Sequence, residues 1–119
     1  MSDYASILMD PRVMEIVQKN KDLNEGKNND FLNFLLNEYP VTDFHLLELS
    51  TSDNFKTLKS TEDKDIGLTE ANEYDYKYKL VLQHIYKTTT NVIIFTVRDK
   101  EDAIYLYDIM SENITLIKE

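Results

Sequence analysis

Residues 73–87, with the sequence EYDYKYKLVLQHIYK, alternate in character over almost their whole length. A period of two predicts a β-strand, because successive side chains leave opposite faces of the strand. So long a strand organises a sheet, and we expect it to be the central strand, at about residues 74–87. One of its faces would carry Tyr74, Tyr76, Tyr78, Leu80, Leu82, His84 and Tyr86.

This strand is long for its chain. Thirteen residues at about 3.3 Å each span about 43 Å, which is more than a globular domain of 119 residues needs. We expect Leu80 and Leu82 to face the core, and the end that carries Tyr74 and Tyr76 to protrude or to bend at a bulge. Protruding tyrosines are good interface anchors, because they are large, amphipathic and low in rotamer entropy.

Two helices are expected before the sheet. Asp10 and Pro11 form a typical helix start, with an Asp N-cap and a Pro at the first helical position, where a missing N–H costs nothing. Gly26 stands where this helix would stop. A second helix is expected to begin near residues 29–30 and to end before Pro40, because the residue before a proline disfavours the helical conformation.

Three further segments have the character of strands. Residues 43–50 carry apolar side chains on both faces, and residues 55–59 alternate enough for a short edge strand. Residues 91–98 are apolar on both faces and rich in β-branched side chains, which predicts an interior strand. Residues 88–91 are expected to turn the chain into it.

The predicted fold class is α+β, with a single domain over residues 1–119. Asp99 is expected to cap a helix at about residues 100–111, with Asp102 in a variant of the capping-box position. A last strand would follow at residues 114–117, parallel to the preceding strand if both belong to one sheet. The expected architecture is two N-terminal helices, an antiparallel or mixed sheet of four or five strands, and this C-terminal helix before the last strand.

The composition excludes several chemistries. The chain has no cysteine, so it has no disulfide, thiolate metal site or cysteine nucleophile. Its two histidines, His45 and His84, lack the spacing of a zinc site, and we expect each to be hydrogen-bonded in the core or at the surface. His84 lies on the tyrosine face and can titrate near neutral pH. No GxSxG or calcium-loop pattern occurs. We therefore expect that the protein is not an enzyme and that it binds no metal and no cofactor.

The charge is strongly acidic and unevenly distributed. The chain has 22 acidic and 13 basic residues, a net charge of −9. Residues 73–99, with three acidic and four basic side chains, are the one part that is not acidic. Such a field repels phosphate backbones and attracts basic partners, and it also keeps a small domain soluble. No signal peptide or apolar run of membrane-spanning length is visible, so we expect a cytoplasmic protein and no membrane partner.

Together these features predict a small acidic protein–protein interaction module, an inhibitor or accessory factor that docks on a basic, nucleic-acid-binding surface of its protein partner. The Asn-, Lys-, Ile- and Tyr-rich composition is typical of a phage or mobile-element product, for which the compartment would be the host cytoplasm. The expected partner-binding residues are those at the start of the long strand and in the acidic segment before it: Glu62, Asp63, Asp65, Glu70, Glu73, Tyr74, Tyr76 and Tyr78.

Two alternatives stay open. The chain could be an assembly subunit that self-associates through the edge of the long strand. It could also be a weak RNA- or DNA-binding domain, because the order strand, helix, strand over residues 92–117 resembles the last βαβ unit of RNA-recognition-type ferredoxin folds. Tyrosines and lysines at residues 74–79 would then form a local stacking and phosphate-binding patch.

Overall fold

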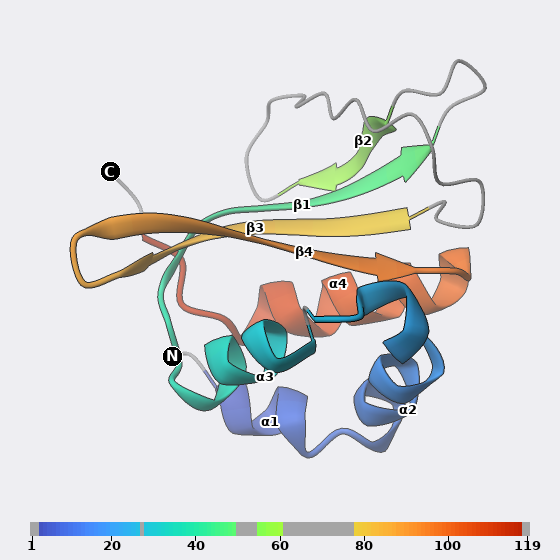
Figure 1. Cartoon of the computed structure of the whole chain (residues 1–119), viewed down its shortest axis with the longest axis horizontal. Coiled ribbons are helices and arrows are strands. Elements are labelled where there is room, and N and C mark those ends of the chain that lie inside the picture. Colours follow the sequence, from blue (N-terminus) through green and yellow to red (C-terminus); the bar gives the residue numbers. More distant parts are fainter. Residues whose placement is uncertain (1–2, 27, 50–54, 61–77, 118–119) are drawn as a thin grey trace.

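The computed structural model describes residues 3–26, 28–49, 55–60 and 78–117, and within them the predicted α+β class is confirmed. The described strands form one antiparallel sheet of four in the order β2-β1-β3-β4. The helices all lie on one face of this sheet (Figure 1). The strands are β1 (Val41–Leu49), β2 (Phe55–Ser60), β3 (Tyr78–Tyr86) and β4 (Thr89–Val97). The helices are α1 (Tyr4–Leu8), α2 (Pro11–Lys19), the 3₁₀ helix η1 (Lys21–Asn24), α3 (Asn28–Leu36) and α4 (Lys100–Asn113).

β3 is the central strand, as predicted, and pairs with β1 on one side and β4 on the other. Leu80 and Leu82 belong to the hydrophobic core on the helix side of the sheet. Lys79 and Val81 alternate with them and are also buried, so both faces of this strand are covered. Residues 74–77 of the expected strand lie outside the described residues.

A tight hairpin joins β3 to β4. The two strands stay in register up to the pair Tyr86 and Thr89, which leaves Lys87 and Thr88 as the turn. Lys87 has a φ of 61°, the left-handed conformation that two-residue hairpin turns require. β4 therefore begins two residues earlier than the strand expected at residues 91–98.

β4 is an edge strand of the sheet that the described residues form, and the prediction of an interior strand is wrong. Among the described strands β4 pairs with β3 alone. Its apolar character has two sources: Ile93, Phe95 and Val97 pack into the core under the helices, and η1 lies against the strand near Thr96. Burial on both faces therefore does not require a strand on both sides.

Two helix starts differ in how the expected caps work. Asp10 caps α2 as predicted, with Oδ1 accepting from the backbone N–H of Arg12 at 2.8 Å and of Val13 at 3.3 Å. Asp99 stands at the N-cap of α4 but makes no side-chain capping bond. Its carboxylate instead accepts from Lys19 Nζ at 2.7 Å, so an ion pair between α2 and α4 has replaced the expected local cap.

The N-terminal region holds one more α-helix than predicted. α1 has five residues, too few to be stable through helix propensity alone. Tertiary contacts hold it: the buried Tyr4 hydroxyl donates to the Tyr39 carbonyl at 2.7 Å and accepts from the Thr115 N–H at 3.0 Å. α2 ends at Lys19, well before Gly26, because the chain turns there into η1.

The chain after α4 forms a parallel bridge to the start of β1, not to β4. Val41 donates its N–H to the Thr115 carbonyl and accepts from the Ile117 N–H, both at 2.8 Å. β2 pairs only with the later part of β1, so the C-terminal segment fills the position that β2 leaves open. The βαβ unit of the RNA-recognition-type resemblance is therefore absent.

Within the described part of the chain, no helix combines the length and the apolar character that crossing a bilayer requires.

Replacing Tyr4 with Phe should lower the free energy of unfolding by about 1–3 kcal/mol, because the Tyr39 carbonyl and the Thr115 N–H both lose a buried partner. Urea unfolding followed by circular dichroism measures the change. Tyr105→Phe is the matched control, since its hydroxyl bonds the half-buried carboxylate of Asp10, which water can reach when the bond is lost. Equal losses in both variants would show that Tyr4 does not fasten α1.

Candidate partner-binding site

Of the expected partner-binding residues, only Tyr78 falls within the described part of the chain. It opens β3, lies opposite Glu48 and Val97, and is half-buried against the hydrophobic core. The other seven lie outside the described residues: Glu62, Asp63, Asp65, Glu70, Glu73, Tyr74 and Tyr76. Their role as a contact surface stays a prediction, and Tyr78 offers only part of its ring to it.

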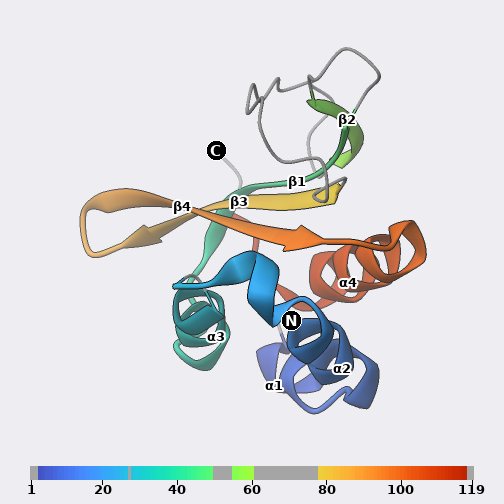
Figure 2. The ribbon, with the colours of Figure 1, turned by 45° about the vertical axis from the view of Figure 1, so that its right-hand side comes forward.

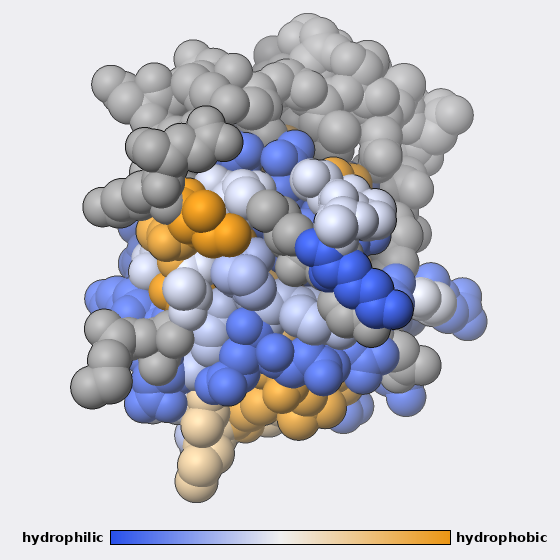
Figure 3. Space-filling view, turned by 90° about the vertical axis from the view of Figure 1, so that its left-hand side faces the viewer, coloured by the Kyte–Doolittle hydropathy of each residue, from blue (hydrophilic) through white to orange (hydrophobic). Residues whose placement is uncertain are grey.

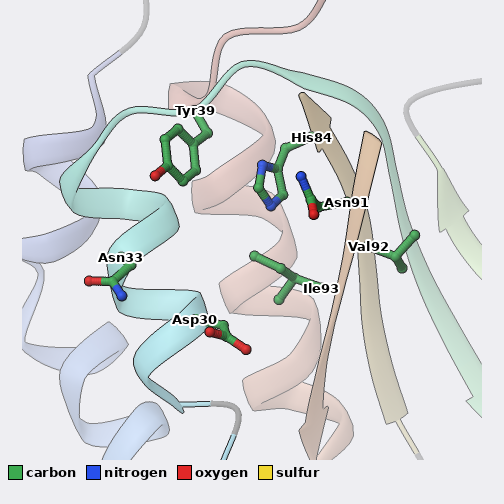
Figure 4. Close-up of a pocket in the computed structure, with 7 residues that line it drawn as sticks. All are labelled: Asp30, Asn33, Tyr39, His84, Asn91, Val92 and Ile93. Atoms are coloured by element: carbon green, nitrogen blue, oxygen red, sulfur yellow. The ribbon is translucent and has the colours of Figure 1, made fainter. Parts of the chain in front are cut away.

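The described residues form a different concave feature, a pocket of about 280 Å³ between α3 and β4 (Figure 4). A smaller pocket of about 150 Å³ continues it along β4, with Asp30 and residues 92–94 in its wall. Both lie on the helix side of the sheet, beside the edge of β4. The larger pocket is lined by Asp30, Asn33, Tyr39, His84, Asn91, Val92 and Ile93.

His84 is the most unusual residue in this pocket. Its side chain is 5% exposed, and its ring stacks on Tyr39 with centroids 5.0 Å apart and planes 3° apart. The Phe34 ring packs against the His84 ring from the core, with the two ring centroids 5.5 Å apart. Its Nδ1 atom is buried with no hydrogen-bond partner among the described residues. Burial lowers the pKa of His84 below its ordinary value of 6.5, so the ring is neutral at pH 7.

The two histidines therefore have different environments. His45 is also buried, but its Nδ1 lies 2.7 Å from the Ser60 hydroxyl, as the expectation of a hydrogen-bonded histidine requires. His84 lacks such a bond at Nδ1. A buried polar atom without a partner is uncommon in folded proteins, and it is a reason to look for a ligand at the pocket.

The polar side chains around the pocket carry one formal charge, on Asp30. Asp30 is exposed in the first turn of α3, and Asn33 follows one turn later on the same helix. Asn91 projects from β4, with its amide donating to the Thr89 carbonyl at 3.1 Å. No lysine or arginine is among the lining residues, so the site is acidic at neutral pH.

The edge of β4 next to the pocket is partly covered by η1. Asn24 donates from Nδ2 to the Thr96 carbonyl at 2.9 Å and accepts on Oδ1 from the Thr96 N–H at 2.7 Å. This side-chain amide makes the two bonds that a neighbouring strand would make. Asn20 Oδ1 extends the cover by accepting from the Arg98 N–H at 3.0 Å.

These bonds define the direction of the other backbone groups on β4. In an antiparallel pair the N–H and C=O of alternate residues point to the same side of the strand. Because those of Thr96 point away from β3, those of Ile94 and Val92 do so too. No described segment pairs with them, and the Val92 side chain is 53% exposed. The strand therefore presents an open edge at residues 92–94, directly above the pocket.

The surrounding surface is mainly hydrophilic. Seen from the end at which the β3–β4 hairpin turns, hydrophilic side chains separate small hydrophobic patches (Figure 3). Other charges near β4 are engaged elsewhere: Arg98 pairs with Asp22 at the far end of the strand, and Lys19 bridges to Asp99. Asp30 is the one acidic side chain in the walls of the two pockets.

Sequence reasoning pointed to His84 but not to the pocket around it. Asp30, Asn33 and Asn91 belong to segments that meet only in the folded chain (Figure 2). The open edge was missed because the apolar pattern of residues 91–98 indicated an interior strand. A signal was present in Asn20 and Asn24, whose short amides after a helix end are suited to binding backbone groups.

Within the described residues, no group of three or more histidine, aspartate or glutamate side chains could hold a metal ion. Comparisons with protein-family models, with curated proteins and with solved structures found no match. The inference about function therefore rests on the geometry and the charge of this site.

His84→Phe should change how stability depends on pH. The folded state disfavours the protonated ring, so the unfolded chain binds more protons once the pH falls below about 6.5, and the wild type loses stability towards acid pH. Phe keeps the stacking and cannot titrate. Urea unfolding at pH 7.5 and 5.5 measures the free energy of unfolding of both proteins. Between these two pH values the wild type should lose more of it than His84→Phe, by up to about 1.4 kcal/mol per pH unit. The same loss in both proteins would exclude a depressed pKa for His84.

Proposed function

We propose that the chain is a small acidic interaction module that binds a basic protein partner as an inhibitor or accessory factor, and that an extended segment of the partner adds as a strand to β4. The observation that carries this proposal is the open edge at residues 92–94, where the outward backbone groups of Val92 and Ile94 have no described partner. Strand addition to such an edge is a common mode of peptide recognition.

Strand addition fits the way this edge is already used. Asn24 satisfies Thr96 with a side-chain amide placed as a strand would be, so β4 accepts a neighbour at that side without distortion. A docked segment would continue the same row of bonds towards the hairpin. Main-chain bonds give affinity with little dependence on sequence, so specificity has to come from side chains on the two faces of the added strand.

The charge of the chain supports a basic partner. A net charge of −9 raises the encounter rate with a positively charged protein and lowers it with nucleic acid. Asp30 adds an acidic group beside the edge itself. The module would act in the cytoplasm, or in the host cytoplasm if the chain is phage-encoded, and a nucleic-acid-binding surface of the partner is the kind of basic surface that it would cover.

Self-association is a second candidate, and the same edge favours it. β3 pairs on both sides over residues 78–84, so this stretch has no edge for another chain. A second copy that paired at β4 would do so against the repulsion of two chains that each carry −9. Sedimentation at 10 and 200 µM should show a monomer at both concentrations; a dimer that Val92→Pro dissolves would favour assembly instead.

Val92→Pro tests the proposed docking edge. Proline removes the outward N–H of residue 92 and places its ring at the edge, but the β3–β4 bonds are left intact. A random heptapeptide display library is selected on the immobilised wild type, and enriched peptides are measured by calorimetry. We expect the selection to enrich basic, β-branched peptides. These peptides should bind Val92→Pro about tenfold or more weakly than the wild type, because the variant lacks the N–H of residue 92 and its proline ring blocks the edge.

Val92→Thr is the matched control, since it keeps the backbone N–H and the β-branch. It should bind within about twofold of the wild type, and thermal unfolding checks that both variants are folded. Enriched peptides that bind Val92→Pro as tightly as the wild type would overturn docking at β4. An absence of enrichment would overturn peptide binding by this edge as well.

The acidic and tyrosine residues before β3 would supply a second contact with the partner. A variant carrying Tyr74→Ala, Tyr76→Ala and Glu62→Lys is expected to recover fewer partners from a lysate than the wild type, because it loses two aromatic anchors and reverses a charge. Quantitative mass spectrometry of the two recoveries measures the difference. Equal recovery of the same partners would confine the contact to other surfaces.

A further inference from the structure

The pocket lies where one side chain of a docked strand would enter it. Side chains of an added strand alternate between the two faces of the sheet, so every second one would lie on the helix side. The larger pocket opens on that side, next to Val92 and Ile93 (Figure 4). We propose that the larger pocket receives an arginine side chain of the docked segment, an inference that rests on the proposed function.

The lining of the pocket favours a cation. Asp30 provides a carboxylate, Asn33 and Asn91 provide amide oxygens, and no lysine or arginine competes for them. The nearest titratable ring, His84, is neutral at pH 7 and does not repel a positive charge. An anionic side chain would meet Asp30 without a compensating cation in the wall. An aliphatic side chain would leave these polar groups without new partners.

Two features favour the guanidinium of arginine over the ammonium of lysine. Tyr39 and His84 stack in parallel, with planes 3° apart, and present aromatic surface along which a planar cation can lie. The Asp30 carboxylate and the amide oxygens of Asn33 and Asn91 place several acceptors around the pocket. A guanidinium carries five N–H groups in a fixed fork, so it can reach several acceptors at once, whereas an ammonium is a point charge.

The size of the pocket agrees with a side chain as its occupant. Its volume of about 280 Å³ is slightly smaller than the pockets of roughly 300–1,000 Å³ that bind drug-sized ligands and cofactors. It opens at the surface beside β4, so a side chain can enter from a strand that remains outside.

The test uses a peptide obtained by the selection on the wild type and replaces each of its basic positions in turn by citrulline or by lysine. Citrulline keeps the planar shape of arginine and removes the charge. We expect one position at which citrulline weakens binding about tenfold and lysine weakens it less. When the same peptides are measured on Asp30→Asn, citrulline at that position should weaken binding only about twofold, because the variant lacks the carboxylate with which the arginine charge interacts.

Glu101→Gln, which removes an exposed carboxylate from α4, is the control and should keep the tenfold cost. Citrulline tolerated within twofold at every basic position, in a peptide that Val92→Pro still weakens, would overturn the arginine pocket and leave strand docking in place. A citrulline cost that is the same in the wild type and in Asp30→Asn would place the arginine elsewhere. Peptides insensitive to Val92→Pro would overturn the proposed function first.

Discussion

The pairing of β3 with β1 on one side and β4 on the other is the interaction on which the rest of the structure depends. It places the strand with the longest alternating pattern at the centre and puts Leu80 and Leu82 under the helices. It also makes β4 the last described strand on its side of the sheet. The open edge follows from that order of strands. The pocket forms beside the edge because α3 lies next to β4, the last described strand (Figure 2).

Asparagine side chains complete this edge where no strand is available. Backbone groups that are buried without a partner cost about 1–3 kcal/mol each, so the part of β4 that lies under η1 has to be satisfied locally. Asn24 does this for Thr96, and Asn20 does it for Arg98. Beyond η1 no described segment pairs with the edge, and water can satisfy the outward groups of Val92 and Ile94 at little cost. The boundary between covered and open edge is thus set by the length of η1.

The sequence was sufficient for the parts of the fold that local chemistry decides. The alternation of residues 78–86, the Asp10 cap and the helix that ends before Pro40 all follow from neighbours in the chain. The parts that it did not reveal depend on distant residues. α1 is held by Tyr4 through Tyr39 and Thr115, and Asp99 binds Lys19 in place of its own helix. The pocket joins α3, β3 and β4, so a pattern within one segment could indicate His84 but not its surroundings.

An open edge strand is a hazard to a soluble protein, because it can pair with another copy of the same chain. Natural proteins prevent this with charge, proline or cover, yet residues 92–94 are uncharged, apolar and only partly covered. On our proposal the protection is global: two chains that each carry −9 would repel one another before their edges meet. The same field attracts a basic segment. The acidity that keeps copies apart would therefore also select the partner, and on our proposal Asp30 converts that long-range preference into a contact at the edge itself.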